Sequence, residues 1–493
     1  MAVQTLRKSS RQWLIFLGLA LIFGSAAGMA VNKVNSPLII LVGLIGLIAL
    51  VGAITAVEFG LLFLIFLTYT RFSDTVVHYY GAPSVAKSFV VVLIVAILIR
   101  WAIFHERPEN WQTPLVLIGV YGLVGFASIL YAPQPDVVWG ALLDYVKDAV
   151  IAVVVVILLR RAPSFRHAIW ALLLAGILMG TVSVYQYYTK TFSNDYGGFG
   201  QAELMQIVGA TNDYRISGVI GDPNFYAQIM VVLVPLALER FLHEKRILLR
   251  LVAGWALIVT ALSVIFTFSR GGFLALVVVL FLFLLLYPPK PTRMPLFILA
   301  VIIVISFVPL SYYDRILSIN QLFTAPDVGF RTNDLAIRGR ASESLAAIEM
   351  FKDHPIFGVG LKNFPYLYLD YAKKIGLAPS SNQRSPHNLY LETAAETGMV
   401  GLFAFAIMIV VTFATIKSAR DRFRRAEMFD YANMVTGFGV ALIGYLVAAI
   451  FIHAAFPRFF YLLIGIGLAL DALAKNEIAE QQVRSSFLAK ARE

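Results

Sequence analysis

The sequence is poor in charged residues and contains no cysteine. Only 14% of its 493 residues are Asp, Glu, Lys or Arg, whereas 59% are hydrophobic. Soluble domains usually carry about a quarter charged residues, and the deficit fits a chain whose solvent is lipid, where charges are costly. Without cysteine, a disulfide framework, a Cys-ligated zinc site and an iron–sulfur cluster are excluded. The composition therefore indicates a membrane protein.

The net charge of +11 allows two explanations. An excess of Lys and Arg can bind nucleic acid, whereas in a membrane protein it marks the loops that face the cytoplasm. We favour the second explanation and expect no nucleic-acid partner. The first apolar run, Trp13–Val31, is long enough to span a membrane and lacks a small-residue cleavage site, so we expect no cleavable signal peptide.

Long apolar runs follow one another along most of the chain. Because a helix needs roughly 20 apolar residues to cross the bilayer, we expect an all-α polytopic membrane protein of about 12–14 transmembrane helices. The runs lie near 13–31, 38–56, 58–72, 87–104, 113–132, 145–161, 166–187, 224–241, 249–268, 271–288, 294–311, 399–416, 432–453 and 457–473. The second and third runs are separated only by Val57 and Glu58.

The basic residues cluster in a way that tests this topology. If the N-terminus is cytoplasmic, most basic clusters face the cytoplasm, as the positive-inside rule expects. They lie at 160–166, 240–250, 290–293, 417–425 and in the C-terminal tail. The two long segments without spans, 188–223 and 311–398, then lie outside.

We therefore predict three parts of the chain. They are N-terminal transmembrane helices (1–210), a core (211–416) with the external loop 312–398, and C-terminal helices with a basic cytoplasmic tail (417–493). A loop of this length is expected to fold, and apolar spacing predicts a helix over 342–352. Its Leu345, Ile348 and Phe351 share one face.

The first candidate site residue is Arg270, in the segment Ser269-Arg270-Gly271-Gly272 between two apolar runs. An arginine at this depth is costly unless it has an anionic partner or reaches the interface. The alternative is an arginine that snorkels or caps a helix in a tight turn. The flanking glycines favour a site, because they let a ligand approach the backbone closely.

The second candidate is Arg215, which our topology places on the same side of the membrane as Arg270. Pro223 is expected to open a helix shortly afterwards, with Asn224 in its first turn, and the amides at that helix end favour an anion. The alternative is a solvated loop arginine followed by an ordinary Asp-Pro turn. We prefer the alternative for Asp222 but not for Arg215.

The third candidate is His387. A helix is predicted to begin at Ser385–Pro386, with the serine as its cap, and to end at Gly398. His387 and Asn388 would lie in its first turn, where the positive helix end favours the neutral imidazole that a general base requires. The alternative is a histidine that only caps or packs at the membrane surface, and for an isolated histidine we favour it.

Other kinds of site find less support. No spacing of His, Asp and Glu resembles a zinc or DxD-type metal site. No internal repeat is evident, so a transporter built from inverted repeats is not supported. Arg340 lies in a basic stretch of the external loop, usually a solvated face, although such a residue could help to hold a phosphate.

Three motifs in this order resemble the O-antigen ligase/polymerase family of membrane glycosyltransferases. They are the "TFSRGGFLAL" turn, "FKDHPIFGVGLKNF" in the external loop, and "SPHNLYLETAAETGMVGL" at the entry to the next helix. The resemblance covers about residues 214–402. It favours a functional role for Arg270 and His387 over the structural alternatives given above. The family is usually drawn with about a dozen helices, so either 38–72 is one broken element or this branch has extra spans.

The resemblance implies a GT-C-like glycosyltransferase that needs no metal or other cofactor. It would move a glycan from an undecaprenyl-diphosphate carrier to a hydroxyl of a lipid or glycan acceptor, with inversion. Arg215 and Arg270 would bind the departing diphosphate, whose oxygens suit arginine's planar fork, and His387 would be the general base. Residues expected to bind substrate are Arg340, Ser269, Asn388 and Asn224.

Several functions remain open at this point. Ligation of a glycan to a terminal acceptor leads, and polymerisation onto another carrier-linked unit is the closest rival. Protein O-glycosylation is a related option. A transporter is less favoured, because it predicts ionisable residues near mid-membrane. The expected location is a bacterial inner membrane, among its lipids, with the active site on the outer side.

Overall fold

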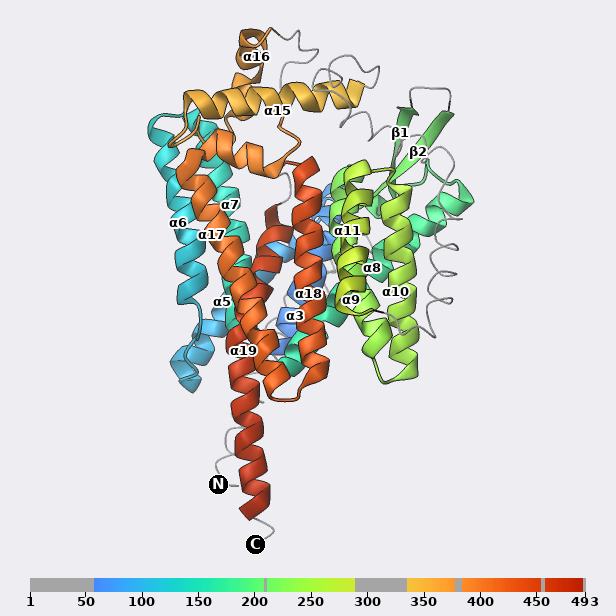
Figure 1. Ribbon diagram of the computed structural model, residues 1–493, viewed down its shortest axis with the longest axis vertical. Coiled ribbons are helices and arrows are strands. Elements are labelled where there is room, and N and C mark those ends of the chain that lie inside the picture. Colours follow the sequence, from blue (N-terminus) through green and yellow to red (C-terminus); the bar gives the residue numbers. More distant parts are fainter. Residues whose placement is uncertain (1–56, 208–210, 289–334, 377–383, 454–456, 491–493) are drawn as a thin grey trace, which may run out of the picture.

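The computed structural model describes residues 57–207, 211–288, 335–376, 384–453 and 457–490 (Figure 1). Among these residues, eight helices are long and apolar enough to cross a membrane. They are α5, α6, α8, α9, α10, α17, α18 and α19, with bounds given below. The prediction of an all-α polytopic membrane protein is therefore confirmed. The predicted spans at 13–31, 38–56 and 294–311 lie outside the described residues.

The described chain begins with a broken helix pair. The elements up to residue 189 are α3 (Val57–Thr70), α4 (Phe72–Tyr80), α5 (Val85–Phe104), α6 (Gln112–Ala127), η1 (Ser128–Leu130), α7 (Pro135–Leu158) and α8 (Ala162–Thr189). Helices α3 and α4 meet at 57° because Arg71 between them is left-handed, with φ of 50°. The predicted span 58–72 is thus bent at its end.

Helix α9 lies at the centre of the bundle. The elements here are η2 (Tyr196–Gly198), β1 (Gln201–Ile207), β2 (Thr211–Gly218), α9 (Pro223–His243), α10 (Ile247–Phe266) and α11 (Arg270–Leu286). Most of α9 is buried, with α8, α10, α11 and α18 packed against it. The two strands form an antiparallel hairpin that places Glu203 opposite Arg215 and leads directly into α9.

The last third of the chain supplies three helices of the bundle and the helices at one of its ends. Its elements are α15 (Leu335–Asp353), α16 (Phe364–Lys374), α17 (Leu389–Arg425), α18 (Phe429–Ala448), η5 (Ala449–Phe451) and α19 (Pro457–Lys490). Helix α15 lies across one end of the bundle, the end that also carries the hairpin (Figure 1). We call this the α15 end and the other the opposite end.

Helix α15 confirms the helix predicted over 342–352 but buries a different face. Leu345 and Ile348 are 40% and 37% exposed, whereas Ala346, Ala347 and Met350 are fully buried. The small alanines let α15 lie close against α16 and α17. Close packing, and not the size of the apolar side chains, therefore decides which face is buried.

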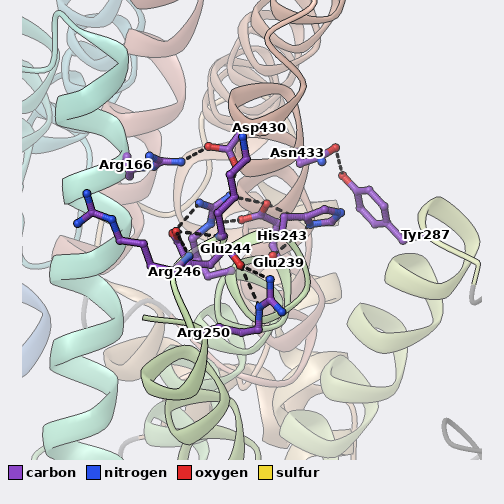
Figure 2. Close-up of polar contacts among 11 residues, drawn as sticks. Arg166, Glu239, His243, Glu244, Arg246, Arg250, Tyr287, Asp430 and Asn433 are labelled. Carbon is purple, nitrogen blue, oxygen red and sulfur yellow. Dashed lines mark hydrogen bonds and ion pairs between the residues drawn. The ribbon is translucent and has the colours of Figure 1, made fainter. Parts of the chain in front are cut away.

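The basic clusters predicted to face the cytoplasm meet at the opposite end. Arg166 and Arg240 both pair with Asp430, and Arg161 pairs with Glu480. Figure 2 shows Asp430 among the polar side chains of this region. The predicted clusters at 160–166, 240–250 and 417–425 thus lie at one end of the bundle, whereas the cluster at 290–293 lies outside the described residues.

Candidate functional site

Arg215 is held rigidly at the α15 end. It is 4% exposed, its Nε donates to the Thr267 carbonyl at 2.6 Å, and its Nη2 donates to Asn224 Oδ1 at 3.0 Å. The hairpin brings the arginine to these partners, which lie at the ends of α9 and α10. Arg215 is therefore a fixed part of the helix-end structure and not a solvated loop residue.

Two helix N-termini converge on the same place. Asp222 caps α9 by accepting from the amides of Asn224 and Phe225, at 2.7 and 3.1 Å. Ser269 caps α11 by accepting from the Gly272 amide at 3.2 Å, and its hydroxyl donates to Asn224 Oδ1 at 2.9 Å. The positive ends of both helices favour a negative charge nearby.

The predicted residues Arg215, Asn224 and Ser269 are thus joined by hydrogen bonds, and Arg270 follows directly as the first residue of α11. We call these four residues the arginine site. Arg270 is partly buried. The structure brings together four residues that lie up to about 55 positions apart in the chain.

The two glycines after Arg270 have a different purpose from the one predicted. A Cβ on Gly271 would lie 2.6 Å from Phe451 Cβ, and one on Gly272 would lie 2.5 Å from Ala227 Cβ. The glycines therefore permit close packing of α11 against neighbouring elements. The expectation that they leave room for a ligand is wrong.

His387 lies beside a buried carboxylate. Its Nδ1 is 2.6 Å from Oε2 of Glu343, whose side chain is fully buried, while the imidazole remains 32% exposed. Arg384 Nη1 donates to the other oxygen, Oε1, at 3.0 Å. The carboxylate therefore orients the ring, and part of the ring surface remains accessible.

The helix after His387 begins later than predicted. Asn388 is the cap of α17, and its Oδ1 accepts from the amides of Tyr390 and Leu391, both at 3.0 Å. His387 lies just ahead of the helix because the asparagine supplies the cap that we assigned to Ser385. The helix also continues past Gly398, where it is kinked, to Arg425.

His453 connects the two groups of residues. Its ring centroid lies 5.5 Å from that of His387 and 5.1 Å from that of Phe225, the neighbour of Asn224. Burial lowers the pKa of His453 to about 4, so the imidazole is neutral near pH 7. The His453 ring thus lies between His387 and Phe225, which follows Asn224 of the arginine site. We call Glu343, Arg384, His387 and His453 the histidine site.

The external loop is fastened to α17 at its kink. Lys362 Nζ donates to Glu392 Oε1 at 2.5 Å, and its amide donates to Glu396 Oε2 at 2.8 Å. Burial lowers the pKa of Lys362, but the charges of both glutamates outweigh this effect and leave the pKa raised. These contacts fix the loop, and with it α15, over the helix ends.

Backbone contacts complete this attachment. The Val359 amide donates to the Ala395 carbonyl, and the Met399 amide to the Pro355 carbonyl, at 2.9 and 2.8 Å. The chains approach so closely that a Cβ on Gly398, where φ is 63°, would lie 2.3 Å from a backbone oxygen. Only glycine fits this position.

Sequence reasoning missed Glu343, Arg384 and His453. A signal for Glu343 exists, because it precedes Ala346, Ala347 and Met350 at helical spacing and shares their buried face. Arg384 and His453 carry no such signal, since their neighbours come from distant segments. The predicted Arg340 lies one turn before Glu343 on α15 and is partly buried.

Among the described residues, no group of three or more His, Asp or Glu side chains is placed to hold a metal ion. The arrangement can instead bind an anion at the arginine site and accept a proton at the exposed edge of His387. The fold and the site together define a polytopic helical membrane protein with a charged site beneath helix α15.

Comparison with protein families makes this class more specific. Residues 255–406 match the model of the family described as O-antigen ligase. The match runs from α10 into α17 and includes Arg270, Glu343 and His387, while Arg215 lies ahead of it. This part of the chain is therefore similar to O-antigen ligases, as its motifs indicated. A search of curated proteins found no match to the chain.

Proposed function

We propose that the protein is a glycosyltransferase that moves a glycan from an undecaprenyl-diphosphate carrier to an acceptor hydroxyl. One observation carries the proposal, namely that the His453 ring contacts both His387 and Phe225, the residue that follows Asn224 of the arginine site. A diphosphate at the arginine site would place the attached sugar within reach of the imidazole. The family match to O-antigen ligase supports this chemistry.

The reaction is a single displacement at the anomeric carbon. The acceptor oxygen forms the new C–O bond as the bond from that carbon to the diphosphate oxygen breaks, and the configuration inverts. The carrier diphosphate leaves with the bonding electron pair, and Arg215 and Arg270 stabilise its negative charge. The acceptor proton passes to the Nε2 of His387. Metal ions take no part.

The site faces the outer side of a bacterial inner membrane in this proposal. The basic clusters at the opposite end support that orientation, because such clusters remain in the cytoplasm. Donor and acceptor would approach from the outer leaflet beneath α15. Arg340, Asn224 and Ser269 would bind substrate around the diphosphate.

Transfer by purified protein tests the proposal. The donor is an undecaprenyl-diphosphate glycan and the acceptor a lipid with free hydroxyls, assayed with and without a chelator. We expect chelator-resistant transfer that falls by at least about 1,000-fold in His387→Ala and Arg270→Ala. Matched controls at the opposite end are His167→Ala and Arg161→Ala, whose side chains are 52% and 64% exposed.

The product then distinguishes the branches of the family. Glycan attached to the lipid indicates a ligase, lengthened carrier-linked glycan indicates a polymerase, and glycan on an added peptide indicates protein glycosylation. Wild-type transfer by His387→Ala would show that the general-base assignment is wrong.

A further inference from the structure

Glu343 is a fully buried carboxylate that touches the exposed histidine of the site. Each of its oxygens has one partner: Oε2 lies 2.6 Å from His387 Nδ1, and Oε1 accepts from Arg384 at 3.0 Å. Burial of a carboxylate costs several kcal/mol unless it is paired and hydrogen-bonded. The contacts with His387 and Arg384 therefore offset the cost of burying the carboxylate.

Packing leaves Glu343 little freedom to move. Ala346, Ala347 and Met350 on the same face of α15 are fully buried, and the neighbouring Ser342 hydroxyl is hydrogen-bonded to Tyr368. The backbone of α15 is thus fixed on both sides of the glutamate. A carboxylate on a rigid element can orient the ring that it touches.

The contact determines which nitrogen of His387 carries the proton. An ionised carboxylate only accepts hydrogen bonds, so Nδ1 must be the donor and Nε2 keeps its lone pair. Arg384 pairs with the other oxygen of the same carboxylate. Nε2 is then the atom that can accept a proton.

We propose that Glu343 is a positioning residue for His387, that it fixes the Nδ1–H tautomer, and that it stabilises the imidazolium formed when Nε2 takes the acceptor proton. This inference rests on the proposed function. Arg384 completes the arrangement, because it holds the second oxygen of the carboxylate. The proton stays on the imidazolium until solvent or product takes it.

The charged and titratable groups around this pair come from several elements. Arg384 pairs with Glu343, and His453 faces the His387 ring. Charges that act on His453 in turn are those of Glu392, Lys362, His387 and Asp222. The pH profile of kcat is therefore compared between wild type and variants that leave all of these other groups unchanged.

Glu343→Gln is the main test, with kcat and KM measured across pH. The amide can donate to Nδ1 and so favour the tautomer whose lone pair points away from the acceptor. We expect kcat to fall about 100-fold with KM for the donor nearly unchanged, and the acidic limb of the profile to move to lower pH. Glu343→Asp should recover part of the loss.

Glu349→Gln is the matched control, because Glu349 lies on the same helix, is 24% exposed and pairs with lysines. It should keep the wild-type rate and profile. Wild-type behaviour of Glu343→Gln, or an equal loss in Glu349→Gln, would overturn the inference. Both outcomes leave the proposed function intact if His387→Ala is still inactive.

A second measurement needs no variant at position 343. In ¹⁵N-histidine spectra of the wild-type protein in detergent, the His387 signals are those missing from His387→Ala. We expect the Nδ1–H tautomer at neutral pH, and the Nε2–H tautomer would overturn the inference even if Glu343→Gln failed to fold. Arg384→Gln, which leaves the glutamate in place, should lower kcat about tenfold.

Discussion

The two ends of α9 carry charged clusters of opposite character. At the opposite end, Arg240 is fully buried and pairs with Glu239, Glu244 and Asp430. Figure 2 shows these three carboxylates close together, with Arg166 on the far side of Asp430. At the α15 end, Arg215 donates to two uncharged oxygens, and the nearby His387 remains partly exposed.

The difference separates a structural cluster from a chemical one. A buried arginine surrounded by carboxylates has its charge balanced within the protein, and it ties α8, α9 and α18 together. An arginine beside the N-termini of α9 and α11 suits a negatively charged ligand. The same residue type thus stabilises the fold at one end of α9 and is proposed to bind substrate at the other.

Arg240→Met should produce the largest effect. It leaves Glu239 and Glu244 buried without their cation, so we expect the free energy of unfolding to fall by about 3–5 kcal/mol. Chemical unfolding in detergent measures this, and transfer per folded molecule should not change. Arg161→Met, at an exposed pair, should cost less than about 1 kcal/mol. If Arg240→Met were stable but inactive, the assignment of a structural role to the opposite end and a catalytic role to the α15 end would be contradicted.

Acidification should destabilise the α15 end through His453. Its folded-state pKa is about 4, whereas a histidine in an unfolded chain titrates near 6.5. Between these values the unfolded state binds more protons, so stability falls as pH decreases from about 6.5 to about 4, by up to about 3 kcal/mol. Unfolding at several pH values tests this. His453→Gln should remove the dependence, and His167→Gln at the opposite end should keep it.

Arg215→Lys should show whether geometry or charge matters at the arginine site. Lysine keeps the charge but cannot bond both the Thr267 carbonyl and Asn224, so we expect kcat/KM to fall about 100-fold. The control is Arg250→Lys, which alters an arginine that holds the Glu244 carbonyl through two nitrogens at the opposite end. Equal transfer by both variants would mean that charge alone suffices.

Asn388→Ala should have the smallest effect. Loss of the cap of α17 is expected to cost about 1 kcal/mol of unfolding free energy, and Asn388→Asp, which can still cap, should restore it. Thermal unfolding measures both. If Asn388→Asp were stable but transferred poorly, the amide would contact substrate, as the family resemblance implied.

Much of the fold was predictable because lipid imposes a simple pattern. The apolar runs at 166–187, 224–241 and 249–268 correspond to α8, α9 and α10, and the observed bounds differ from the predicted ones by only a few residues. The run at 145–161 became α7, which begins ten residues earlier, at Pro135. Its charged residues Asp144, Lys147 and Asp148 interrupt the apolar pattern, so hydropathy alone misplaces its start.

The site was only partly predictable. Arg215, Asn224, Ser269 and Arg270 do meet, as their positions at the ends of successive apolar runs suggested. The glycines after Arg270 and the start of the helix after His387 were misread, because helix packing and capping depend on neighbours that local sequence does not name. The roles of the site residues stay predictions.

The hydropathy of the sequence is enough to predict a helical membrane protein and most of its long apolar helices, because hydrocarbon excludes charge wherever it meets the chain. The motifs around Arg270 and His387 likewise indicate the family whose model matches residues 255–406. The contacts of Glu343 and His453 with His387 arise only from tertiary packing, since they join residues 44 and 66 positions away from it. Such contacts depend on how helices pack, and no local pattern encodes that.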